Sequence, residues 1–107
     1  MGQQPITLEM MRGALYSAVV CDCLDAAGLR RQSPRIRWET FALDRPLIGR
    51  CKTTLWADAF HELDNPYELE LRAVDTCGAD DVFIAAASGS QRSAVWGELL
   101  STAARLR

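Results

Sequence analysis

The sequence predicts an α/β fold, in which helices and strands alternate along the chain. Residues 47–56 and 82–87 form short runs that suit strands, because they are apolar or carry side chains that favour a pleated surface. Stretches with the apolar spacing of helices precede, separate and follow these two runs. Because parallel sheets are normally larger than two strands and covered on both faces, we expect further strands to come from elsewhere.

Length and composition describe one soluble globular domain. The chain has 107 residues, of which 49% are hydrophobic and 24% charged, and a net charge of -2. This balance gives no reason to expect a nucleic-acid partner, and no run is apolar enough to span a membrane. The N-terminus lacks the regions of a signal peptide, so we expect a cytoplasmic protein with reduced cysteines.

Two helices are expected in the N-terminal part, over residues 7–28. Thr7 is a suitable N-cap for the first, and Ser17 for the second. Gly28 is placed to end the second helix in a left-handed conformation. Cys21 and Cys23 lie two residues apart in this helix and point to different faces, so they are interpreted as buried or half-buried thiols rather than as half of a metal site.

Residues 29–44 form a connector that contains four arginines and the aromatic residues Trp38 and Phe41. Basic residues interleaved with aromatic ones can contact nucleic acid. We favour a solvated connector whose aromatic side chains pack on the core, because the chain as a whole is slightly acidic.

The first expected strand contains Gly49, which indicates a bulge or close approach to another backbone. The next helix is predicted to have Asn65 as its cap and Pro66 in its first turn. Its buried face is predicted to contain the apolar side chains that share helical spacing, Tyr67, Leu71 and Val74.

A turn at 77–81 leads into the second strand, and Ser88-Gly89-Ser90 follows it as a flexible turn that lacks the pattern of a P-loop. The last helix is expected to begin between Ala94 and Glu98 and to run to the end of the chain. Its apolar side is predicted to hold four residues in line: Val95, Leu99, Ala103 and Leu106.

The start of the last helix is the candidate site for an anion, because free backbone N–H groups there can bind a carboxylate or phosphate. Glu98 could orient a water or accept a proton, or it could simply be a carboxylate that favours the helix dipole. Gly97 would cost about 1 kcal/mol inside a helix. Close approach of a ligand, or a tight contact with another helix, would explain it.

His61 is the only histidine, and its acidic neighbours Asp58, Glu62 and Asp64 could form a metal cluster. The spacing matches no ligand signature, so we favour a surface histidine.

Five segments resemble the RraA-like family, which includes the regulator of ribonuclease activity A and the 4-hydroxy-4-methyl-2-oxoglutarate aldolases. The most specific is Trp-Gly-Glu-Leu-Leu-Ser-Thr-Ala-Ala at 96–104. The others, in the family's order, are 16–25 with Gly28 and Leu29, then 49–53, 64–65 and 79–82.

This resemblance implies a layered α/β fold of the swivelling-domain type, built as trimers or hexamers with active sites between subunits. It implies cleavage of a carbon–carbon bond to pyruvate and a second keto acid, decarboxylation of oxaloacetate, and a divalent metal, usually Mg²⁺, that stabilises the pyruvate enolate. Gly97, Glu98, Leu99 and Leu100 are implied to bind the pyruvate unit through backbone amides. Glu98 is also implied to orient a metal-bound water.

In the family, a strand and a Gly-Val-Val-x-Asp-Gly-x-x-Arg-Asp segment follow, whose arginine holds the substrate and whose aspartate holds the metal. This sequence ends at Arg107, before that segment. We therefore expect one partial domain over 1–107, helical at 7–28 and α/β at 45–107, without the family's C-terminal strands and without a metal ligand.

Three interpretations remain open. The first is a truncated relative of the metal-dependent class II pyruvate aldolases and oxaloacetate decarboxylases, inactive or very weak alone. The alternative function is a non-enzymatic regulator that binds a protein partner, in the manner of the ribonuclease regulators. The third is a truncated or degraded gene product, or a free-standing assembly unit that completes its sheet by oligomerising.

Overall fold

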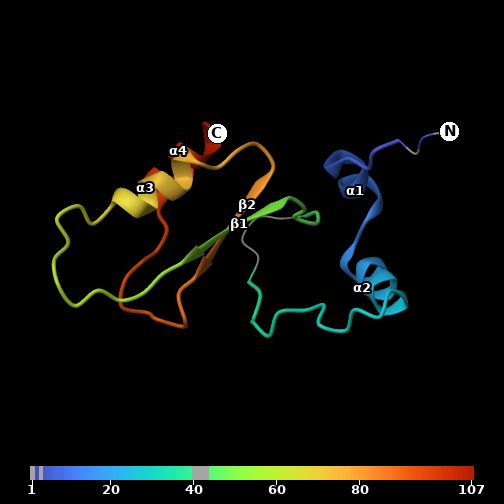
Figure 1. Cartoon of the computed structure of the whole chain (residues 1–107), viewed down its shortest axis with the longest axis horizontal. Helices are drawn as coiled ribbons and strands as arrows, with labels where there is room; N and C mark the ends of the chain where they lie inside the picture. Colours follow the sequence, from blue (N-terminus) through green and yellow to red (C-terminus); the bar gives the residue numbers. More distant parts are fainter. Residues whose placement is uncertain (1, 3, 40–43) are drawn as a thin grey trace. The chain divides into compact units, whose positions relative to one another are not determined.

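The computed structural model describes residue 2, residues 4–39 and residues 44–107. The chain divides into two units, Met1–Ile48 and Gly49–Arg107. The element order is helix, helix, strand, helix, strand, helix (Figure 1), which confirms the predicted order and the α/β class. None of the helices in the described ranges is long and apolar enough to cross a membrane.

The first helix, α1, spans Leu8–Ala14 and begins where the sequence predicts. The Thr7 hydroxyl accepts a hydrogen bond from the Met10 N–H at 3.2 Å, which confirms Thr7 as the N-cap. The Arg12 guanidinium donates from Nε and Nη2 to the Ile48 carbonyl, at 3.1 and 2.9 Å. This pair joins α1 to the end of the same unit.

The second helix, α2, spans Ser17–Ala26, so Ser17 is its first residue and Tyr16 is the N-cap. The prediction that Ser17 caps the helix is wrong, because no side chain makes a cap hydrogen bond there. The other end is as predicted: Gly28 has φ +78°. The Leu29 N–H bonds the Leu24 carbonyl at 2.8 Å, and the Gly28 N–H bonds the Asp25 carbonyl at 3.0 Å, which together form a Schellman motif.

The described part of the connector has neither helix nor strand, as expected. Trp38 is 69% exposed, so the prediction that it packs on the core is wrong; Phe41 lies outside the described residues. Two of the arginines are in ion pairs, Arg30 with Asp25 at 3.2 Å and Arg37 with Glu39 at 3.7 Å. Local carboxylates thus offset part of the basic charge.

The C-terminal unit is built on a parallel pair of strands, β1 (Arg50–Leu55) and β2 (Asp81–Ala86), in register from Arg50 opposite Asp81 to Leu55 opposite Ala86. A Cβ at Gly49 would lie 2.3 Å from the Asp80 carbonyl oxygen. The predicted close approach of backbones at Gly49 is therefore confirmed, and it brings the two strands together where they begin.

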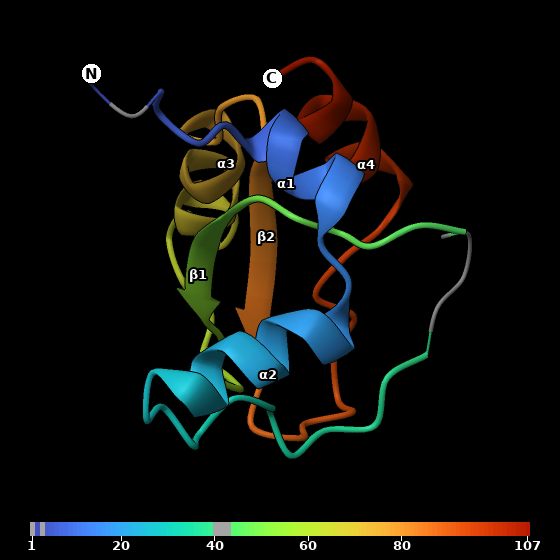
Figure 2. The same cartoon turned by 90° about the vertical axis from the view of Figure 1, so that its right-hand side faces the viewer.

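Two helices of eight residues, α3 (Glu68–Asp75) and α4 (Glu98–Arg105), pack against each other. Figure 2 shows both behind the two strands, on the same side of the sheet. Among the described residues only Val74 of α3 and Leu100 of α4 are buried, with 1% and 8% of their surface exposed. The core of this unit thus includes the contact between α3 and α4.

Several predicted details of these helices are wrong. The α3 helix begins at Glu68, its N-cap is Tyr67 rather than Asn65, and no side chain caps it. Val74 is buried as predicted, but four of the other residues expected on the apolar faces are exposed: Tyr67, Leu71, Leu99 and Leu106. Tertiary contacts select other residues than helical spacing alone suggests.

Candidate active site

The helix α4 begins with backbone donors that no described residue of the protein occupies. Gly97 is the N-cap, in an extended conformation with φ −157° and ψ −172°, and it has no side chain to cap the helix. In the described part of the chain, the N–H groups of Glu98, Leu99 and Leu100 have no hydrogen-bond acceptor. These three donors and the positive end of the helix dipole form a place where an anion can bind.

A short chain of hydrogen bonds fixes the backbone at this helix start. The Trp96 indole Nε1 donates to the Ser101 hydroxyl at 2.8 Å, and that hydroxyl donates to the Gly97 carbonyl at 2.9 Å. The Ser101 N–H bonds the same carbonyl at 3.0 Å. The Trp96 ring also packs on Phe83 of β2, with ring centroids 4.8 Å apart. The sheet and the helix therefore both hold the residue before Gly97.

Neither the backbone conformation at position 97 nor the neighbouring residues require a glycine there. It lies at the N-cap, where glycine is well tolerated, so the expected cost of glycine inside a helix does not arise. A Cβ added to Gly97 would meet no atom of the described residues within 4 Å, so none of the described helices makes a tight contact there. The space beside its Cα is open, which leaves room for a ligand.

The side chains of the other three predicted residues do not converge on one point. The Glu98 carboxylate is exposed and has no ion pair or hydrogen bond with the residues that the structure describes. Leu99 is 86% exposed, whereas Leu100 is 8% exposed and belongs to the core. The four residues can therefore act on one ligand only through their backbone groups, to which Glu98 adds one free carboxylate.

A cavity of about 370 Å³ lies where β1 and β2 end, and the sequence analysis did not anticipate it. Its lining includes Trp56 and Asp58, which follow β1, and Ser90, which follows β2. Ser93, Ala94 and Val95 also line it, directly before the Trp96–Gly97 segment. The predicted strands could have indicated its position, because ligands of parallel sheets bind beyond the carboxyl ends of the strands.

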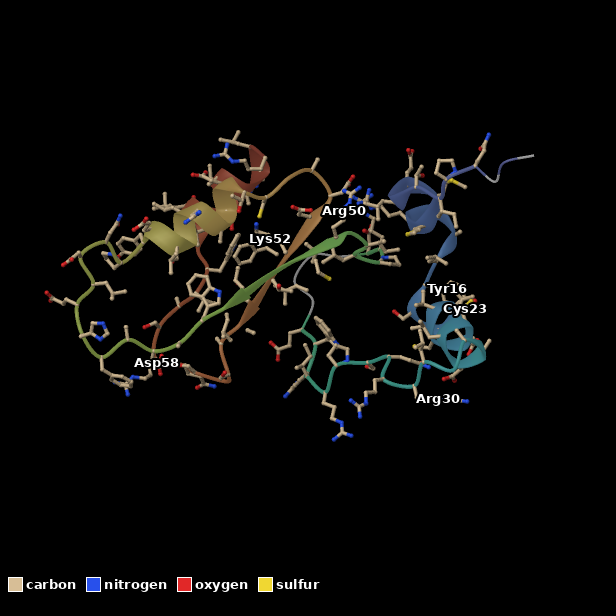
Figure 3. All side chains as sticks on the ribbon, in the orientation of Figure 1. Tyr16, Cys23, Arg30, Arg50, Lys52 and Asp58 are labelled. Carbon is tan, nitrogen blue, oxygen red and sulfur yellow. The ribbon has the colours of Figure 1, made fainter. Side chains whose placement is uncertain are left out.

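Asp58 is one of two half-buried acids that line this cavity; the other is Glu70. Figure 3 shows Asp58 past the end of β1 opposite to Arg50. Its Oδ1 accepts a hydrogen bond from the Ser90 hydroxyl at 2.7 Å, which joins the segments that follow the two strands. Ser90 also accepts from the Arg92 N–H at 3.3 Å. The turn before Ser90 is tight, since Ser88 and Gly89 have φ +53° and +75°.

The described residues do not contain a group of three metal-ligating side chains. His61 is exposed in the segment between β1 and α3, so it is a surface histidine in this structure. All four cysteines are free, but Cys23 and Cys51 are exposed, which corrects the expectation that the thiols are buried or half-buried.

Comparison with known proteins gives one match. The family model described as RraA-like, Aldolase/RraA, matches residues 17–107, which include α2 and the whole C-terminal unit. No curated protein and no solved structure matches the chain significantly.

Proposed function

The chain belongs to the RraA-like family, and we propose that it supplies the keto-acid-binding part of a carbon–carbon lyase of the aldolase and oxaloacetate decarboxylase type. The observation that carries the proposal is the start of α4, where three unpaired N–H groups lie beside the open space at Gly97. We propose Gly97, Glu98, Leu99 and Leu100 as the residues that bind the pyruvate unit.

The chemistry of this site follows from the charge of the ligand. A pyruvate carboxylate would accept hydrogen bonds from the amides of Glu98, Leu99 and Leu100, as anions do at helix N-termini. Cleavage of the bond between C3 and C4, one carbon away from the keto group, leaves negative charge on an enolate. Donors that are already fixed toward that position stabilise the charge without reorganising. The hydrogen bonds from Trp96 and Ser101 would keep them fixed.

We propose Glu98 as the residue that orients a water or receives a proton. Its carboxylate is exposed and is not engaged by another described side chain. A positioned carboxylate of this kind typically contributes to proton transfer when it can reach the substrate directly or through one water.

The divalent metal that the family resemblance implies does not fit the described residues. Glu98 has no second and third ligand near it, because no group of three such side chains occurs in the described ranges. Magnesium prefers octahedral oxygen ligands and commonly uses one or two carboxylates. We therefore propose that a substrate arginine and the further metal ligands lie outside these residues, and we assign no step to a metal here.

The fold and the assembly also need elements beyond the described residues. We propose a swivelling-domain fold that the 107 residues form only in part, in trimers or hexamers. The sheet of the described residues has only two strands, so each strand has an unpaired edge. Leu55 of β1 is 85% exposed, as it would be if another element covered it in the assembly.

The activity assay combines the chain with a complementary segment that carries the Gly-Val-Val-x-Asp-Gly-x-x-Arg-Asp pattern. With Mg²⁺ and oxaloacetate, release of pyruvate is expected from the mixture, with absent or very weak release from the chain alone. Glu98→Gln should lower the activity of the mixture, whereas Glu62→Gln, in an exposed segment, should not. If the isolated chain released pyruvate as fast as a complete family member, the proposal that it needs a further arginine and further metal ligands would be wrong.

A regulator of ribonuclease activity would behave differently in a pull-down. Capture of a ribonuclease that is equally strong with Glu98→Ala, together with no activity in the mixture, would replace the lyase proposal by the protein-binding one.

A further inference from the structure

The cavity beyond the strand ends adjoins the proposed pyruvate site. Val95 lines the cavity and precedes Gly97 by two residues, so their Cα atoms are at most about 7.6 Å apart. A substrate whose keto-acid end binds the α4 amides would therefore reach the cavity with its other end. The volume of about 370 Å³ lies in the range of small-molecule sites.

Two carboxylates line this cavity and offer hydrogen-bond acceptors to a ligand. Asp58 on the β1 side and Glu70 of α3 both line it and are half-buried. The Oδ1 of Asp58 accepts from Ser90, and Glu70 has no partner among the described residues. A carboxylate offers about four acceptor positions. Most of the acceptor capacity therefore remains for a ligand.

The cavity offers nothing that would neutralise a second carboxylate. None of the described residues that line it is Arg, Lys or His. The nearby Arg92 holds its guanidinium over the Phe60 ring, 5.1 Å from the centroid. A carboxylate brought between Asp58 and Glu70 would meet two like charges. An uncharged group with several hydroxyls would instead donate to both acids and pack its carbon atoms on Trp56 and Tyr67.

We propose that this cavity binds an uncharged, hydroxyl-bearing half of the substrate, so that the bond cleaved joins pyruvate to a polyhydroxylated aldehyde. The proposal rests on the proposed lyase function and deepens it. In that cleavage the C3–C4 bond of a 4-hydroxy-2-keto acid breaks and its electron pair stays on C3. The C4 hydroxyl loses its proton as it becomes the aldehyde carbonyl, and C3 takes up one proton to become the methyl group of pyruvate. No oxidant or reductant is needed.

The test compares two probes of four carbons, erythritol and succinate, on the ¹⁵N-labelled chain. Erythritol should shift the amide signals of Asp58 and Ser90, and succinate should not. The double variant Asp58→Asn/Glu70→Gln should bind erythritol about tenfold more weakly, as expected for one lost hydrogen bond to a charged group. Because the amide introduced by Asp58→Asn keeps an oxygen that can accept from Ser90, the turn should fold. Glu62→Gln, which changes an exposed acid outside the cavity, should bind like the parent.

Four results would overturn the proposal. In the parent, these are succinate shifting these signals, Mg²⁺ alone shifting them, or erythritol failing to shift them. The fourth is erythritol binding the double variant as tightly as it binds Glu62→Gln. The comparison of probes on the parent does not depend on the variants folding. A parallel titration with pyruvate monitors Glu98, Leu99 and Leu100. If pyruvate binds there and erythritol leaves Asp58 and Ser90 unchanged, only the cavity proposal fails. If erythritol binds and pyruvate does not, the proposed function fails.

Discussion

The helices α3 and α4 are similar in sequence terms but differ at their first turn. Each has eight residues, begins with glutamate and lacks a side-chain cap. Before α3, Tyr67 continues a turn with φ −101° and ψ −2°, and the Glu68 N–H bonds the Asn65 carbonyl at 3.3 Å. Before α4, Gly97 is extended, and the Glu98 N–H has no acceptor in the described ranges.

This difference shows that the residues before a helix decide whether its first amide is free to bind a ligand. A turn that enters a helix uses the first amide internally, whereas an extended segment leaves it free. At α4 the extended segment is also held in place, by Trp96 and Ser101. Four predictions test this comparison, beginning with the largest effect.

Leu100→Ala should produce the largest loss of stability, because Leu100 is the one buried side chain of α4 among the described residues. The free energy of unfolding should fall by about 2–5 kcal/mol, as for other buried leucines. Leu99→Ala, one residue earlier and 86% exposed, is the matched control and should change it by less than about 0.5 kcal/mol. Urea denaturation measures both, and equal losses would mean that α4 packs on another face.

Gly97→Ser should separate binding from stability. The serine hydroxyl can accept from the free amides of α4, so stability should rise by a few tenths of a kcal/mol. The same hydroxyl fills the open space and competes for the donors, so pyruvate should bind at least about tenfold more weakly, or about 1.4 kcal/mol. Titration calorimetry and thermal unfolding measure the two effects. Unchanged pyruvate binding would show that the ligand does not use these amides.

Ser101→Ala should remove the hydrogen bonds to Trp96 and Gly97. The expected loss of stability is about 1 kcal/mol, and the indole N–H signal of Trp96 should shift because it loses its acceptor. Thr102→Ala, an exposed neighbour on the same helix, should leave that signal in place. An unmoved indole signal in Ser101→Ala would contradict the hydrogen-bond chain.

The smallest effect concerns the first glutamate of each helix. Glu68→Gln and Glu98→Gln should each cost about 0.3–1 kcal/mol, because both carboxylates lie near a helix N-terminus. If Glu98 acts only in this way, the two variants will match in every assay. A loss of activity in the complemented mixture for Glu98→Gln but not for Glu68→Gln would establish the additional role.

Local signals in the sequence predicted the parts of the fold that local chemistry decides. Thr7 and Gly28 are examples, since an N-cap hydroxyl and a left-handed glycine act within a few residues. The close approach of another backbone to Gly49 was also predicted, although only the structure shows that the Asp80 carbonyl is the group that approaches it.

The sequence could not predict which side chains are buried. Helical spacing placed Leu99 in line with Val95, whereas Leu100 is the buried residue of α4, which packs against α3. The pairing of Asp58 with Ser90 was hidden for a similar reason, because 32 residues separate them and only the parallel pairing of β1 and β2 brings them together. Gly97 and Glu98 were singled out correctly as the start of the last helix, and their role in binding stays a prediction.

A titration of the ¹⁵N-labelled chain with pyruvate tests the central claim most directly. The account predicts that the amide signals of Glu98, Leu99 and Leu100 shift together and saturate, while those of Glu68, Leu69 and Glu70 at the start of α3 stay in place. Equal shifts at both helix starts, or none at α4, would contradict it.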